Sequence, residues 1–336
     1  MQASKTISNN ELKTKNNVLD KNKKVLLISV VLIGIFSVLF LTYDVNFKFI
    51  DYALSLRVPK LMAIFLTGFC IAVSSVIFQT IVNNNILTPS VLGLDSLYVL
   101  LQTTVVFMVG VDSILIRDKN LNFIVSVLGM IVLSFVLYKV LFEKNGNNIF
   151  FMLLVGMIFG TLFSSLSNFM QIMIDPNEFD ALQSRINASF LTVNIDIIRI
   201  SAVMIVISVI AMYKDFKYLD VMSLGKDQAI NLGVDYDRLV KKLMIFIAIL
   251  VSISTALVGP ITFLGLLVVN LSRQLVTTYK HSYLILSAIL ISILTLIAGQ
   301  FFVERIFSFT TTIATIINFV GGIYFIYLLL KESNND

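Results

Sequence analysis

The chain of 336 residues has very little of the chemistry on which most enzymes depend. It contains one cysteine (Cys70), one histidine (His281) and no tryptophan. A lone cysteine excludes a disulfide or a cysteine-ligated metal within one chain, and a lone histidine beside Lys280 is expected to be a solvated residue at a polar turn. The sequence has no Walker-type phosphate loop, so we do not expect it to bind ATP in that way. We therefore expect neither an enzyme nor a resident cofactor.

Charged residues are scarce as well. They make up 13% of the chain, against 57% hydrophobic residues and a mean hydropathy of +0.93. This composition excludes a soluble domain and predicts an all-α integral membrane protein, because a helix satisfies its own backbone polar groups in lipid. The net charge of +5 gives no reason to expect a nucleic-acid partner. A span needs about 20 mainly apolar residues, and ten segments qualify: 25–43, 58–82, 91–111, 121–142, 149–173, 195–213, 239–258, 261–277, 283–303 and 311–330.

The distribution of basic residues predicts the orientation of these ten helices. With the N-terminus inside, 17 of the 25 lysines and arginines face the cytoplasm and 8 face the other side, in agreement with the positive-inside rule. Both termini are then cytoplasmic, in a multi-pass protein of the cell (cytoplasmic or inner) membrane. Residues 1–24 are polar and expected to be disordered. Residues 25–332 form the membrane domain, with a turn at Gly259-Pro260 because proline ends or kinks a helix.

The most polar segment between two apolar ones covers residues 214–242, with six basic and five acidic side chains. Its pattern predicts a short helix from Lys226 to Leu232 that ends at Gly233, where a left-handed C-terminal cap residue is wanted. A solvated segment of this kind, about residues 214–238, is either an ordinary loop or a contact surface for a cytoplasmic partner.

Polar side chains inside the spans are few but regularly spaced. Asp95 and Glu304 lie near span ends, so the spans lack the central carboxylates expected of an ion-coupled carrier. Gly156 and Gly160 form a GxxxG pair, which permits close approach of two helices. Two spans carry polar residues at i, i+4 and i+7, a spacing that places them on one helical face, lining either a translocation path or a neighbouring helix: Ser164, Asn168 and Gln171, and Thr311, Thr315 and Asn318.

Four sequence blocks, spread along nearly the whole chain beyond the tail, carry a family resemblance. They are Leu56-Arg-Val-Pro-Lys60, Asn85-Ile-Leu-Thr-Pro-Ser-Val-Leu-Gly-Leu-Asp-Ser96, the Leu224-Gly225 pair with Ala229 and Leu232-Gly-Val234, and Gly259-Pro-Ile-Thr-Phe-Leu-Gly-Leu266. Together they resemble the permeases of ABC importers for iron chelates and vitamin B12. The resemblance implies a type II ABC importer permease fold, with ten helices in the subunit and no cofactor of its own.

Departures from the family pattern narrow the resemblance. Val269-Asn270 stands where the family usually has Pro-His, and Asp175-Pro-Asn-Glu-Phe179 follows the fifth span. These features resemble a sub-branch linked to ferric siderophores of the petrobactin and anguibactin types. The implied function is import of a ferric siderophore into the cytoplasm. An ion-gradient-coupled carrier and a channel-like or structural membrane protein are the alternatives.

The resemblance also implies partners. Cytoplasmic ATP-binding subunits would hydrolyse ATP, a second and different permease would complete a heterodimer in preference to a homodimer, and an extracytoplasmic siderophore-binding protein would deliver the chelate. The implied contact with the ATP-binding subunits involves six residues: Leu224, Gly225, Lys226, Ala229, Leu232 and Gly233.

Three outer basic residues match positions that the resemblance associates with docking of the binding protein. They are Arg57 and Lys60 in the first block and Arg305 after the ninth span. The alternative for Arg57 and Arg305 is interfacial snorkelling or an internal ion pair with Asp51 or Glu304.

Overall fold

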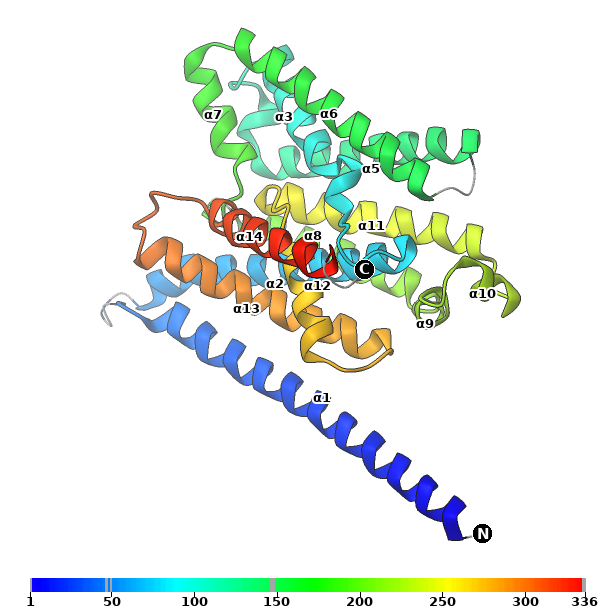
Figure 1. The fold of residues 1–336 in the computed structure, drawn as a ribbon. Coiled ribbons are helices and arrows are strands. Elements are labelled where there is room, and N and C mark those ends of the chain that lie inside the picture. Colours follow the sequence, from blue (N-terminus) through cyan, green and yellow to red (C-terminus); the bar gives the residue numbers. More distant parts are fainter. Residues whose placement is uncertain (1, 46–47, 49, 146–148, 192, 334–336) are drawn as a thin grey trace.

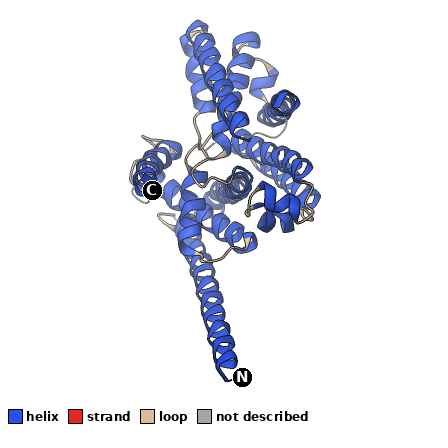
Figure 2. Cartoon of the chain, turned by 45° about the vertical axis from the view of Figure 1, so that its right-hand side comes forward, coloured by secondary structure: helices blue, strands red, loops and turns tan. Residues whose placement is uncertain are grey.

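The computed structural model describes residues 2–45, 48, 50–145, 149–191 and 193–333. Within these residues the chain forms helices and loops but no strand (Figure 2), so the predicted all-α class is confirmed. Its long apolar helices are α1 (Gln2–Thr42), α2 (Ile50–Val82), α3 (Leu94–Val109), α5 (Lys119–Asn145), α6 (Ile149–Met173), α8 (Ile195–Met212), α11 (Tyr236–Val258), α12 (Leu264–Leu275), α13 (His281–Arg305) and α14 (Ile313–Ser333).

Short helices connect them outside these spans. They are η2 (Pro89–Leu92), α4 (Ile114–Arg117), α7 (Pro176–Ile186), η3 (Phe216–Tyr218), α9 (Leu219–Met222) and α10 (Lys226–Asn231).

Each of the ten predicted spans coincides with one of these apolar helices, as expected. Eight helices of the described part are long and apolar enough to cross a membrane, whereas α3 and α12 are shorter. Both short helices follow a glycine with positive φ: Gly93 (φ 77°) precedes α3, and Gly259 (φ 103°) ends α11 five residues before α12 begins. The predicted turn at Gly259-Pro260 is therefore confirmed.

The polar N-terminal segment differs from the expectation. Residues 1–24 were expected to be disordered, but the structure continues helix α1 back to Gln2. The sequence contains no proline or glycine before Gly34, so no residue in this segment breaks a helix that the apolar part has already started.

The core is built around three helices. Helices α2, α11 and α13 are the most buried of the candidate spans, whereas α1, α6 and α14 are the least buried. Figure 1 shows α2, α11 and α13 in the middle of the molecule, with α3, α5, α6 and α7 on one side and α1 on the other. The apolar exposed faces of α1, α6 and α14 are therefore left for lipid or for another membrane subunit.

The predicted GxxxG pair packs against the start of α3. A Cβ atom on Gly93 would lie 2.6 Å from the Cα atom of Gly160, and a Cβ on Gly156 would lie 3.1 Å from the Cα of Leu92. Only glycines permit backbones to approach this closely. The close helix approach predicted for Gly156 and Gly160 is confirmed, and it fixes the position of the junction between η2 and α3.

The connections gather at two ends of the bundle. In Figure 1, α9, α10, the N-terminus and the α12–α13 connection lie at the right-hand end, while α7, the α1–α2 connection and the α13–α14 connection lie at the left-hand end. The positive-inside distribution assigns the first end to the cytoplasm. We call these the cytoplasmic end and the outer end.

Candidate coupling site and outer pocket

The cytoplasmic segment between α8 and α11 is shaped by two glycines. Gly225 (φ 98°, ψ 165°) precedes α10 and Gly233 (φ 85°) follows it. The Gly233 N–H donates to the carbonyl of Ile230 (2.9 Å), and the Val234 N–H donates to the carbonyl of Ala229 (3.1 Å). This pair of bonds is a Schellman motif, in which the left-handed residue ends the helix. The predicted short helix and its glycine cap are confirmed.

The same segment presents apolar side chains at a polar end of the molecule. The exposed fractions of Leu224, Ile230 and Leu232 are 56%, 47% and 63%, whereas Ala229 is fully buried. The Lys226 ammonium lies 3.3 Å from the carboxylate of Asp237 on α11. Apolar side chains held outside the membrane spans form a surface suited to a groove on another protein.

His281 lies at the base of this segment and is not the solvated residue that its polar neighbours suggest. It is 5% exposed and is the first residue of α13. Its Nδ1 atom lies 2.7 Å from Oδ1 of Asp220 on α9, and its backbone N–H donates to the same oxygen at 2.7 Å. Its Nε2 atom lies 2.9 Å from the hydroxyl of Thr80 on α2. The expectation is corrected because packing of α13 against two other helices, not its neighbours in sequence, decides its burial.

Other hydrogen bonds join the same end. The buried Tyr236 hydroxyl, at the start of α11, donates to the carbonyl of Ile81 near the end of α2 (3.2 Å). Asn22 on α1 exchanges two hydrogen bonds with the backbone of Thr277 in the α12–α13 connection. The C-terminal end of α2 is thus bonded by Tyr236 at the start of α11 and by His281 at the start of α13.

At the outer end, Arg57 serves the end of α1. Its Nη1 atom donates to the carbonyls of Phe40 (3.1 Å), Leu41 (3.1 Å) and Tyr43 (2.9 Å). The last carbonyls of a helix have no partner within the helix. Arg57 therefore satisfies the C-terminus of α1 and ties it to α2.

Lys60 and Arg305 also have internal partners. Lys60 pairs with Glu304 (3.0 Å), and Arg305 pairs with Asp44 (2.8 Å), which is not one of the partners considered for it. Glu304 is nearly buried, with 9% of its side chain exposed. The structure thus brings the three predicted docking residues together around the α1–α2 connection, but gives each one a structural contact within the chain.

The polar stripe of α6 divides between two roles. Ser164 donates to the hydroxyl of Ser96 on α3 (3.0 Å), and Gln171 donates to the hydroxyl of Thr103 (3.2 Å). Asn168 is exposed. Two members of the stripe therefore hold α6 against α3, and the third faces outward.

The stripe of α14 is mostly engaged in local structure. Thr315 bonds the hydroxyl of Thr312 through its own hydroxyl (2.9 Å) and its backbone N–H (3.3 Å), which caps the start of the helix. Asn318 accepts the backbone N–H of Phe263 (3.4 Å), just before α12. Thr311 is half-buried and precedes the helix.

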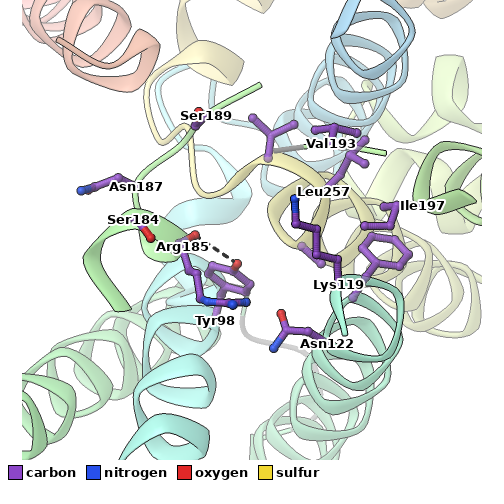
Figure 3. Close-up of a pocket in the computed structure, with 13 residues that line it drawn as sticks. Tyr98, Lys119, Asn122, Ser184, Arg185, Asn187, Ser189, Val193, Ile197 and Leu257 are labelled. Atoms are coloured by element: carbon purple, nitrogen blue, oxygen red, sulfur yellow. Dashed lines mark hydrogen bonds between the residues drawn. The ribbon is translucent and has the colours of Figure 1, made fainter. Parts of the chain in front are cut away.

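A cavity of about 150 Å³ lies between α3, α5, α7, α8 and α11, towards the outer end. We call it the outer pocket. Figure 3 shows Lys119 from α5 and Arg185 from α7 on two sides of it, with Tyr98 and Asn122 below them. None of its lining residues is acidic. Burial lowers the pKa of the Arg185 guanidinium, but an arginine in a protein does not lose its proton, so Arg185 brings a positive charge to the lining.

Comparison with known proteins identifies the family. The model of the FecCD transport family matches residues 24–331. The chain belongs to this family. This FecCD protein is 56% identical over 297 residues to the petrobactin import system permease protein YclO of Bacillus subtilis (strain 168), covering 88% of this chain and 94% of that protein. It is 38% identical to the petrobactin import system permease protein FatC of Bacillus anthracis, covering 82% of this chain and 78% of the relative.

A solved structure shares the fold of this FecCD protein. It is a metal-chelate type ABC transporter in an inward-facing conformation, with a TM-score of 0.78 and 22% sequence identity, covering 92% of this chain and 99% of that one. At this identity the likeness shows the fold alone. The resemblance to iron-chelate importer permeases, and the fold that it implied, are confirmed.

The sequence analysis did not identify the residues that surround His281, or the basic residues that line the outer pocket, in this FecCD protein. It did not connect Asp220 or Thr80 with His281, because these residues are far apart in the chain and carry no shared motif. It did not single out Lys119 or Arg185 either. A signal for the last two was present, since basic residues on the outer side run against the positive-inside trend.

Proposed function

We propose that the chain is the membrane-spanning permease subunit of an ATP-driven importer that moves a ferric siderophore of the petrobactin type into the cytoplasm. The observation that carries the proposal is 56% identity to the petrobactin permease YclO across nearly the full length of both proteins.

The α9–α10 segment is the proposed contact with cytoplasmic ATP-binding subunits, which would hydrolyse the ATP. Leu224 and Leu232 supply exposed apolar side chains, and Lys226 adds a positive charge. Ala229 packs inward, and Gly225 and Gly233 set the backbone. A short helix on a rigid base is suited to fill a groove on a partner and to move with it.

The second permease subunit is proposed to be a different chain. Two petrobactin import permeases of Bacillus anthracis, FatC and FatD, match this protein at 38% and 24% identity. Two such proteins in one organism support a heterodimer, in which this chain takes the FatC-like place. The exposed apolar faces of α6 and α14 offer membrane surface for the contact, and Asn168 on α6 is then placed to line a path between the subunits.

An extracytoplasmic siderophore-binding protein is proposed to dock at the outer end. Arg57, Lys60 and Arg305 stand beside two carboxylates, so the cluster keeps one net positive charge. Each of them also has a contact within the chain, so the charges of the cluster are shared between these contacts and a docked protein. Charge reversal of Arg57 would disturb the α1 cap as well, so Asp44→Asn is the cleaner test. It adds positive charge without removing an arginine and should speed association at low salt.

The outer pocket is the proposed contact for one anionic arm of the chelate. A cavity of 150 Å³ is about the size that accommodates a benzene ring, so it accepts a carboxylate or catecholate arm but not a whole ferric chelate. Lys119 and Arg185 supply the charge that such an arm requires. Arg185→Gln should weaken uptake of the anionic chelate at limiting concentration, while Ser184→Ala at the same pocket serves as the matched control.

Complementation tests the proposal directly. A Bacillus subtilis strain lacking YclO is supplied with this chain, and uptake of radioactive iron as ferric petrobactin is measured under iron limitation. We expect restored uptake that fails when the ATP-binding subunit is inactivated and survives collapse of the ion gradients. Uptake that follows the ion gradient and ignores the ATP-binding subunit would instead show a secondary carrier.

A further inference from the structure

Three elements that are distant in the sequence meet at His281. Asp220 belongs to α9 in the cytoplasmic segment, His281 begins α13, and Thr80 lies in the last turn of α2. The bridge consists of three contacts of 2.7, 2.7 and 2.9 Å. The His281 side chain is 6% exposed, and Asp220 keeps 39% exposure towards the cytoplasm. A hydrogen-bonded bridge with a buried imidazole at its centre holds its members in one arrangement.

Asp220 acts as the N-terminal cap of α13, although it is not part of that helix. The His281 N–H is one of the unpaired donors at the helix start, and no side chain of the preceding residue bonds it. The Asp220 carboxylate accepts it, and a negative charge is favourable at a helix N-terminus. Any displacement of α9 therefore acts on the end of α13 through two hydrogen bonds to one oxygen atom.

The bridge is satisfied in either protonation state of the imidazole ring. Nδ1 is placed to donate to Asp220 in both states. In the neutral ring, Nε2 accepts the hydroxyl proton of Thr80; in the charged ring, Nε2 donates to Thr80, whose hydroxyl then donates to the carbonyl of Val76 (2.8 Å). The connection is thus a mechanical one, not one that opens when the ring gains a proton.

We infer that His281 is a positioning residue for transport, which transmits movement of the α9–α10 segment to α13 and α2. The inference rests on the proposed function, since it takes that segment as the contact with the ATP-binding subunits. The structure supplies what transmission needs: a short segment outside the membrane, a buried side chain that bonds it, and two long membrane helices on the other side of that side chain. Tyr236, which bonds the carbonyl of Ile81 on α2, holds the segment at its other end.

The test uses the full chain, assembled with its ATP-binding, second permease and binding-protein partners in proteoliposomes. The measured quantity is ferric petrobactin taken up per ATP hydrolysed. Loss of a hydrogen bond to a charged group shifts an equilibrium by about tenfold or more, so His281→Ala should lower this ratio about tenfold while ATP hydrolysis continues. Lys280→Ala, at the exposed neighbouring residue, is the control and should leave the ratio unchanged.

A covalent replacement distinguishes transmission from simple stability. Cys70 is the only cysteine of this chain and is buried, so Cys70→Ala provides a background in which this chain has no thiol. Asp220→Cys together with His281→Cys removes the bridge, and a short bifunctional methanethiosulfonate reagent then rejoins the two positions. We expect rejoining to restore most of the uptake per ATP, and a reducing agent to abolish it again.

Three results would overturn the inference: a wild-type ratio in His281→Ala, loss of the ATP-binding subunits from the purified His281→Ala complex, or no recovery after rejoining. Loss of the subunits would show that the bridge only maintains the docking surface. The proposed function fails separately, if the wild-type assembly takes up no ferric petrobactin in the same vesicles.

Discussion

The two glycines of the cytoplasmic segment should respond differently to the same substitution. Gly225 has φ 98° and ψ 165°, a region of backbone space that is essentially restricted to glycine. Gly233 has φ 85° and closes a Schellman motif, a left-handed position that asparagine tolerates better than other side chains do. We therefore expect Gly233→Asn to transport nearly as well as wild type, and Gly225→Asn to transport poorly.

The size of the expected effect on transport follows from backbone strain, because a side chain at either position has room. A Cβ at position 233 meets no atom within 4 Å, and a Cβ at position 225 meets only the flexible end of Gln228, at 3.1 Å. A side chain in the glycine-only region costs about 1–3 kcal/mol, which corresponds to roughly 5- to 150-fold in an equilibrium. A β-branched residue is strained at both positions, so Gly233→Val should fall well below Gly233→Asn.

The assay is ferric petrobactin uptake, with the amount of inserted protein measured by immunoblot and ATP hydrolysis measured in parallel. Adding Gln228→Ala to Gly225→Asn removes the one nearby side chain and should not rescue uptake if the backbone is responsible. Equal uptake for Gly225→Asn and Gly233→Asn would refute the reasoning. Wild-type uptake for Gly225→Asn and for Gly233→Val would show, in addition, that the segment does not transmit movement.

Further substitutions separate packing from transport. Asn168→Leu should lower uptake several-fold without reducing insertion. Gln171→Leu should loosen α6 from α3 and lower the melting temperature in detergent. If Asn168→Leu instead lowers the melting temperature and Gln171→Leu lowers uptake, Asn168 is a packing residue. Gly160→Ala should destabilise the protein by about 1–3 kcal/mol, because its Cβ would lie 3.0 Å from the Cα of Gly93, and an unchanged melting temperature would contradict this. Arg57→Gln should expose the α1–α2 connection to protease, and equal cleavage of wild type and variant would show that the α1 cap is dispensable.

Local signals account for the parts of the fold that the sequence predicts well. Each span is a long apolar run, and the helix from Lys226 is marked by a glycine at each end, so both depend on residues that are close together in the chain. The contact of Gly160 with Gly93 was predicted only in part. The GxxxG pair predicted that another helix would approach closely, but it did not predict which one. A single sequence does not say which element a small-residue face will meet.

His281 shows that neighbours in sequence can predict the wrong environment for a residue. Its neighbours in sequence are polar, which indicates a solvated turn, yet it is buried because α9 and α2 close over the start of α13. Its partners, Asp220 and Thr80, are brought to it only by the packing of three helices. The sequence therefore contains the histidine, the aspartate and the threonine of the site. Their contact in space is a property of the tertiary structure.

The outer arginines show that a family motif predicts the residue type at a position better than it predicts the role of that residue. Arg57 and Arg305 occupy the positions that the family resemblance associates with docking, but here their nearest partners are the carbonyls at the end of α1 and the carboxylate of Asp44. A guanidinium has five donors in a fixed fork, so it can satisfy a helix end and still present charge outward. Because its donors are shared in this way, replacing such an arginine removes two interactions at once. A change at Asp44, which alters the charge and leaves the fork in place, separates them.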